Sequence, residues 1–165
     1  MADAWLKGPV DGVPPALQPV AHAFLNLQLE LDAVLADLSD EEAWRPAGTA
    51  APIGFHVRHL CGSIDRLLTY ARGMALNDAQ LATLGAEKEL TGPGRAGLRE
   101  LVRQTVEAGL AQLRATPAAT LDEPREVGRK RLPSTVRGLL FHAAEHGARH
   151  TGQAVTTKRF VRSRE

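Results

Sequence analysis

Hydrophobic residues recur at alternating steps of three and four along four segments of the chain, with polar residues, proline and glycine between them. This spacing gives each segment one apolar stripe, which is typical of helices that pack lengthwise against one another. The segments run from about 15 to 38, 52 to 73, 95 to 115 and 134 to 161. No alternating run predicts a convincing strand. We therefore expect an all-α four-helix bundle, with residues 1 to 165 forming a single domain.

Residues that favour helix starts and stops mark several of the boundaries. Pro52 suits the first turn of the second helix, and Gly73 is a plausible C-terminal stop. The Pro-Ser-Thr sequence at 133 to 135 supplies N-cap chemistry for the last helix. We expect a short helix or ordered connector over 78 to 90, and a basic loop over 117 to 132.

Composition limits the chemistry that the chain can perform. At 165 residues, 44% of them hydrophobic, the chain can bury a core without disulfides or a structural metal. Cys61 is the only cysteine, which excludes an intrachain disulfide and any cysteine metal knuckle. We expect its thiol to be buried in the core rather than to act as a nucleophile. A bound metal must then be held by imidazole and carboxylate groups.

Charge and hydropathy argue against two classes of partner. The formal net charge is +1 and no run approaches 18 apolar residues, so we expect no membrane span. The N-terminus lacks the features of a signal peptide, which predicts a cytoplasmic protein. Basic residues are concentrated at 127 to 131 and 158 to 164. We interpret these segments as solvated surface, and we do not expect nucleic acid as a partner.

Five of the six histidines lie on two of the predicted helices. His56 and His59 are on the second helix, whereas His142, His146 and His150 are on the fourth. Two imidazoles at positions i and i+4 are about 6 Å apart along one helical face, so both can reach one ion at about 2.1 Å. A third ligand must come from another helix. Isolated packing histidines do not explain this clustering, and we therefore predict a metal site.

Helical geometry ranks these candidates. On the fourth helix His150 lies within the apolar face, His146 lies at its edge and His142 lies further round. On the second helix His56 lies nearer the apolar face than His59, so the wheel alone slightly favours His56. The polar stripe that contains both continues along the same helix.

Arg66 and Tyr70 belong to this polar stripe of the second helix. A guanidinium group can anchor an anion, and a phenol can donate a proton. We therefore consider both residues candidates for a catalytic role in the metal cavity.

Two segments, 52 to 70 and 141 to 154, resemble the DinB-like (YfiT-like) superfamily of metal-dependent proteins. The superfamily's HxxxHxGQ ending is matched at 146 to 153, and its second-helix histidine is matched by His59. A single-helix wheel does not account for the crossing angles of a bundle, so the resemblance outweighs the preference for His56. It implies three metal ligands, with His56 as the reserve: His59, His146 and His150.

The resemblance also implies a fold, a cofactor and an assembly. Members are four-helix bundles with a three-histidine site for a zinc, nickel or iron-like divalent ion, and they are often dimeric, so we expect a homodimer. Characterised relatives are transferases or isomerases that use low-molecular-weight thiols such as bacillithiol or mycothiol. Because 165 residues leave no room for the second domain of the mycothiol-dependent isomerases, we expect the chain to be nearer the single-domain branch.

The leading hypothesis is a thiol-dependent S-transferase or related enzyme that acts on a small-molecule substrate. Its open metal site would lower the pKa of a bound thiol. Two alternatives stay open: a metal-dependent hydrolase, and a non-catalytic metal-binding or stress-response protein. A nucleic-acid accessory role would rest on the basic segments alone.

Overall fold

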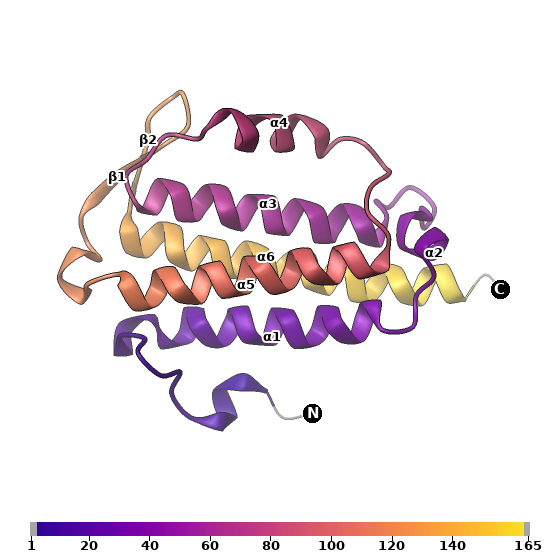
Figure 1. Ribbon diagram of the computed structural model, residues 1–165, viewed down its shortest axis with the longest axis horizontal. Coiled ribbons are helices and arrows are strands. Elements are labelled where there is room, and N and C mark those ends of the chain that lie inside the picture. Colours follow the sequence, from indigo (N-terminus) through magenta and orange to yellow (C-terminus); the bar gives the residue numbers. More distant parts are fainter. Residues whose placement is uncertain (1–2, 164–165) are drawn as a thin grey trace.

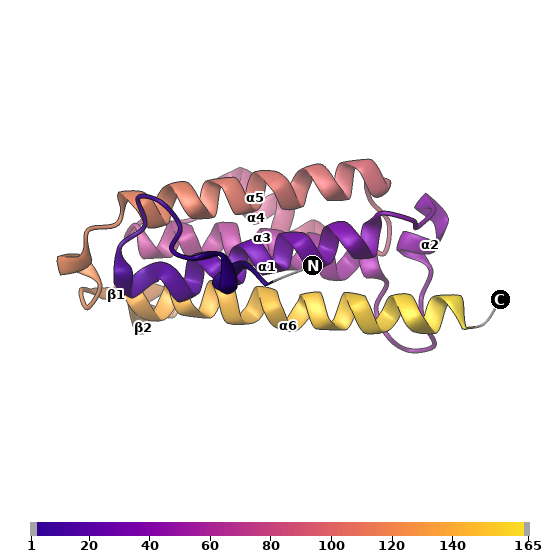
Figure 2. The same ribbon diagram turned by 90° about the horizontal axis from the view of Figure 1, so that it is seen from below.

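Four long helices lie side by side in the computed structural model, which describes residues 3 to 163 (Figures 1 and 2). They are α1 (Gln18–Leu35), α3 (Ile53–Ala71), α5 (Arg95–Ala115) and α6 (Val136–Arg162). Each of α3 and α1 packs against both α5 and α6, which closes the bundle around one core. The predicted all-α four-helix bundle is therefore confirmed.

Shorter elements connect these helices. Helix α4 lies along the outer side of α3, in the connection between α3 and α5 (Figure 1). Within residues 3–163, no helix combines the length and the apolar character needed to cross a membrane. The short elements are η1 (Ala4–Lys7), η2 (Pro15–Leu17), α2 (Asp40–Trp44), α4 (Asp78–Ala86), η3 (Ala118–Thr120), β1 (Pro124–Val127) and β2 (Leu132–Thr135).

The apolar stripes of the long helices meet in the core. Phe24 of α1 and Leu140 of α6 are among its fully buried side chains. Glycine allows close approach at two points: a Cβ added to Gly109 would lie 2.9 Å from the Phe24 ring, and one added to Gly147 would lie 2.7 Å from Leu27 Cδ1. Both distances are shorter than carbon atoms tolerate, so α5 and α6 approach α1 closely only because these positions lack a side chain.

The first long helix ends three residues before the apolar pattern that predicted it, which continues to Leu38. Helix α1 ends at Leu35, and Leu38 is buried in the turn that follows. Ser39 then caps α2: its hydroxyl accepts a hydrogen bond from the Glu42 amide, and the Glu42 carboxylate accepts one from the Ser39 amide. This capping box starts a new helix and separates it from α1.

The expectation that the chain lacks strands was wrong for the segment before α6. Strands β1 and β2 form an antiparallel hairpin in which Val127 pairs with Leu132, and Gly128 and Arg131 adopt positive φ angles in its turn. Four-residue strands with mostly exposed side chains carry no clear alternation, which is why the pattern predicted a loop. The expected cap of α6 is present, because the Thr135 hydroxyl accepts a hydrogen bond from the Gly138 amide at 3.0 Å.

Trp44 holds the start of α3 against the connector that leads into α5. Its Nε1 donates a hydrogen bond to the Pro93 carbonyl at 3.0 Å. A Cβ added to either Gly54 or Gly92 would lie 2.6 Å from the indole ring, so the ring fits between two glycines. Trp44 is the last residue of α2, and its side chain therefore attaches this short helix to the start of α3 and to the connector.

Substitution of Phe24 tests whether the core is packed around this side chain. We expect Phe24→Ala to lower the free energy of unfolding by about 3–5 kcal/mol, because it removes a fully buried ring and leaves a cavity. Phe141 is 63% exposed, and Phe141→Ala is the matched control with a change near zero. Urea unfolding followed by circular dichroism measures both, and equal losses in the two variants would contradict this description of the core.

Candidate metal centre

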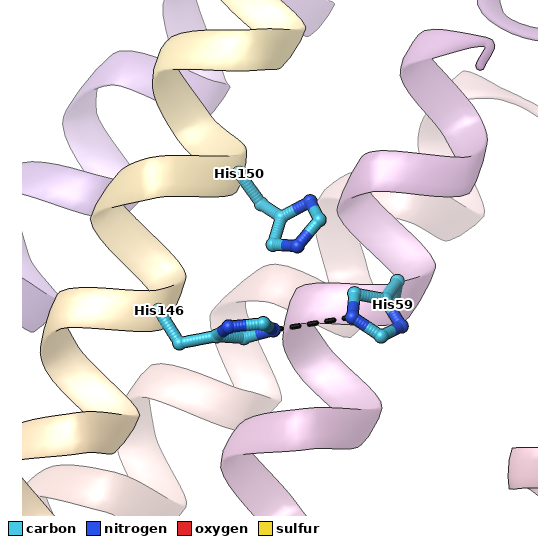
Figure 3. A group of neighbouring side chains, drawn as sticks. All are labelled: His59, His146 and His150. Atoms are coloured by element: carbon cyan, nitrogen blue, oxygen red, sulfur yellow. Dashed lines mark hydrogen bonds between the residues drawn. The ribbon is translucent and has the colours of Figure 1, made fainter.

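His59 of α3 and two histidines of α6, His146 and His150, point toward one another (Figure 3). Each offers one ring nitrogen, and these three atoms lie within 4.8 Å of one another. His59 Nε2 and His146 Nε2 are 3.1 Å apart. The two α6 side chains are one turn apart, so they project from the same helical face toward α3.

The chemistry and spacing of this cluster fit a divalent ion. Two nitrogens that bind one ion at about 2.1 Å are roughly 2.9–3.4 Å apart, depending on whether the angle between them is octahedral or tetrahedral. The 3.1 Å separation of the His59 and His146 Nε2 atoms lies in this range. Among residues 3–163, the group of potential ligands has three members, all of them imidazoles. This donor set suits zinc, nickel or iron(II).

Neutral imidazole is the form that binds metal, and the surroundings of the cluster favour it. Burial, followed by the charges of His59 and His146, lowers the pKa of His150 to about 4. Burial, followed by the charge of His59, also lowers the pKa of His146. At neutral pH both rings therefore offer a lone pair without first losing a proton.

His56, the reserve ligand, lies behind His150. It is 6% exposed, and its Nδ1 is 3.1 Å from Nδ1 of His150. Burial, followed by the charge of His59, lowers the pKa of His56. The helical wheel placed His56 correctly near the apolar face, but this position brings it against a candidate ligand rather than into the group of three. With Nδ1 of His150 engaged by His56, Nε2 of His150 is left for the centre.

Glu87, which follows α4, is a buried contact of the centre that the sequence did not reveal. It is 5% exposed, and its Oε2 accepts a hydrogen bond from His59 Nδ1 at 2.8 Å. Arg66 donates to both Glu87 oxygens, at 2.5 and 3.3 Å. Burial alone would raise the pKa of Glu87, but the hydrogen bonds from His59 and Arg66 outweigh it and the pKa is lowered. The ionised carboxylate fixes the proton of His59 on Nδ1, so that Nε2 faces the other histidines.

Two residues of α3 make room for Glu87 and hold its backbone. A Cβ added to Gly62 would lie 2.5 Å from Glu87 Oε1 and 2.9 Å from Arg66 Nη1, so glycine is needed for the carboxylate to reach this position. Arg58 donates hydrogen bonds to the carbonyls of Glu87 and Thr91, at 3.1 and 2.7 Å. The connector is thereby attached to the helix that carries His59.

The structure separates the two catalytic candidates of the polar stripe. Arg66 reaches the centre indirectly, because it binds the carboxylate that binds His59. Tyr70 is eleven residues beyond His59, about 16 Å along the helix axis. Its side chain borders a different cavity, of about 670 Å³, together with Met74 and Arg125. The structure therefore does not bring Tyr70 to the histidines.

The fold and the site together define the class of protein. It is an all-α four-helix bundle in which two neighbouring helices bring three histidines together, and this cluster can hold a metal ion. The chain belongs to the DinB superfamily, whose family model matches residues 23–154. This match confirms the resemblance noted in the sequence. No curated protein is similar to the chain at a significant level.

A solved structure has a similar fold. The crystal structure of a conserved protein from Enterococcus faecalis superposes with a TM-score of 0.73 and 16% sequence identity. The alignment covers 89% of this chain and 97% of that chain. At this identity the likeness concerns the fold alone.

Cys61 lies on α3 but is turned away from the cluster, into the core, where it is 2% exposed. Burial raises the pKa of its thiol to about 12, although a hydrogen bond with Thr105 acts in the opposite direction. The thiol therefore stays protonated at neutral pH, as expected for a packing residue.

Alkylation tests this assignment of Cys61. We expect iodoacetamide at pH 8 to leave Cys61 unlabelled in the folded protein, because the reagent needs an accessible thiolate. The same reagent in 8 M urea, where the chain is unfolded and the thiol titrates near its usual pKa of about 8.5, should label it fully. Mass spectrometry reads both reactions, and rapid labelling of the folded chain would contradict the buried position.

Proposed function

We propose that the chain binds one divalent metal ion through His59, His146 and His150, and that it acts on a small molecule as a thiol-dependent S-transferase or related enzyme. The observation that carries this proposal is a set of three imidazoles without a fourth protein ligand among the described residues. All three side chains are partly exposed. Three-ligand sites of this kind leave a coordination position for a non-protein ligand.

A bound divalent ion would lower the pKa of a thiol or a water molecule that binds to it. The residues of the chain prepare this position: His146 and His150 stay neutral, and Glu87 orients His59. Cys61 is protonated and buried away from the cluster. Since it is the only cysteine, the thiol must come from a small molecule rather than from the protein, which supports a low-molecular-weight thiol as co-substrate.

Hydrolysis is less well supported, because it needs a carboxylate that is available as a base beside the ion. Both oxygens of Glu87 accept hydrogen bonds from His59 and Arg66. Glu145 is paired with Arg149 and His142. A non-catalytic metal-binding role requires the same three ligands, and differs in that no thiol binds the loaded protein.

Metal analysis of protein without a histidine tag tests the ligand set. We expect about one ion per chain after reconstitution near pH 7.5, where the imidazoles are neutral. His146→Ala and His150→Ala should each lose the ion, because two imidazoles bind it too weakly to survive desalting. His142→Ala, which changes a half-exposed histidine of the same helix, is the control and should retain it. A wild-type protein without metal, or an unchanged content in His146→Ala, would refute the site.

Two substitutions test whether Glu87 orients His59 for the ion. We expect Glu87→Gln to weaken metal affinity by about 10–100-fold, because it removes the charged acceptor of the Nδ1 proton. Gly62→Ala should have a similar effect, since its methyl group displaces the carboxylate without changing any ligand. Gly85→Ala, where a Cβ meets open space, is the matched control. Competition titration with a chromophoric chelator gives the affinities, and wild-type values for Glu87→Gln and Gly62→Ala would exclude this role.

A further inference from the structure

A cavity of about 480 Å³ lies beside the candidate metal centre, in the groove between α6 and the start of α3. His56 belongs to its wall, and Nδ1 of His56 is 3.1 Å from Nδ1 of His150, so one side chain, His56, separates the cavity from the candidate ligand His150. Its walls include Ala50, Ala51, Arg149, Gly152, Gln153 and Phe160.

The cavity and the Glu87 network lie on opposite sides of His59. Glu87 contacts His59, Gly62 and Arg66, which follow one another toward the C-terminus of α3. The cavity lies toward the N-terminus of the same helix, where His56 forms part of its wall. On the Glu87 side the groove beside His59 is therefore filled by an ion pair, whereas on the other side it contains the cavity, with His56 between the cavity and His150.

The side chains around the cavity offer hydrogen-bond donors and no carboxylate. Glu145 accepts hydrogen bonds from Nε and Nη2 of Arg149, which leaves Nη1 without a partner among residues 3–163. The Gln153 amide likewise has no protein partner within that range. Phe160 is 58% exposed and, with Ala51, adds an apolar surface. The volume is within the range of small-molecule sites, about 300–1,000 Å³.

We propose that this cavity, the α6 pocket, binds a carboxylate carried on a short apolar chain, the other end of which reaches the metal centre. The inference rests on the proposed function and specifies the class of molecule that it uses. Guanidinium and amide donors recognise a carboxylate, and the ring of Phe160 covers the chain. Gln153 lies three residues beyond His150, about 4.5 Å along the helix axis, so one small molecule can contact both regions.

Two thiols of equal chain length test the recognition of a carboxylate. Protein loaded with Co²⁺ is titrated with 6-mercaptohexanoate and with 6-mercaptohexanol, and binding is followed by the visible spectrum of the cobalt. We expect the carboxylate to bind about tenfold more tightly than the alcohol, as for a hydrogen bond to a charged group. Arg149→Gln should remove most of this preference, and it changes no proposed ligand of the metal.

Substitutions of two glycines test whether the thiols bind in the α6 pocket. A Cβ added to Gly152 meets no atom within 4 Å, so the ring of Gly152→Phe can enter the cavity without disturbing the helix. We expect this variant to keep its cobalt and to bind both thiols at least about tenfold more weakly, as for a site whose ligand contacts are blocked. Gly85→Phe, which also adds a ring in open space but on α4, should bind both thiols as the wild type does.

The outcomes separate this inference from the proposed function. If cobalt does not bind, or if neither thiol changes its spectrum, the proposed function fails and the inference fails with it. If both thiols bind with equal affinity, and Gly152→Phe binds them as the wild type does, the α6 pocket is not their site. The proposed function would then stand without it.

Discussion

The contact between α3 and α6 determines where every residue of the candidate centre lies. His56 contacts His150 and His59 contacts His146, a pattern that two antiparallel helices in direct contact produce. Gly147, one position after His146, lets α6 pack closely on its neighbours: an added Cβ would lie 2.7 Å from Leu27 Cδ1 and 3.3 Å from Ile64 Cδ1. Because helix packing fixes the separation of the backbones, it also fixes the separation of the three ring nitrogens. The core and the centre thus depend on the same interface.

A second constraint comes from the connector that contains α4. Helix α4 itself has no buried residue, yet Glu87 directly after it is one of the most buried charged groups of the chain. Burying an unpaired carboxylate is costly, so its position requires both Arg66 and His59 as partners. The absence of a side chain at Gly62 and the hydrogen bonds from Arg58 make this arrangement possible. An apparently peripheral segment therefore orients a residue of the bundle.

The sequence predicted most of what is local and little of what depends on tertiary contacts. The pairing of His146 with His150 follows from their spacing on one helix, and their proximity needed no knowledge of the bundle. The choice between His56 and His59 depends on how α3 is rotated against α6, which a single-helix wheel does not contain. Glu87 lies 28 residues from His59 in a segment without an apolar stripe, and no local pattern connects the two. The hairpin before α6 was missed because its strands are too short to show a period.

The two sides of His59 differ in a way that bears on function. On the side of Glu87 and Arg66, the two charged groups satisfy one another and Glu87 is buried, so they offer nothing further to a ligand. On the side of the α6 pocket, Nη1 of Arg149 and the side-chain amide of Gln153 lack protein partners within residues 3–163, and Gly152 leaves open space. A purely structural metal site would be expected to close both sides with protein groups. The asymmetry instead favours a centre in which the protein orients the ligands from one side and a small molecule approaches from the other.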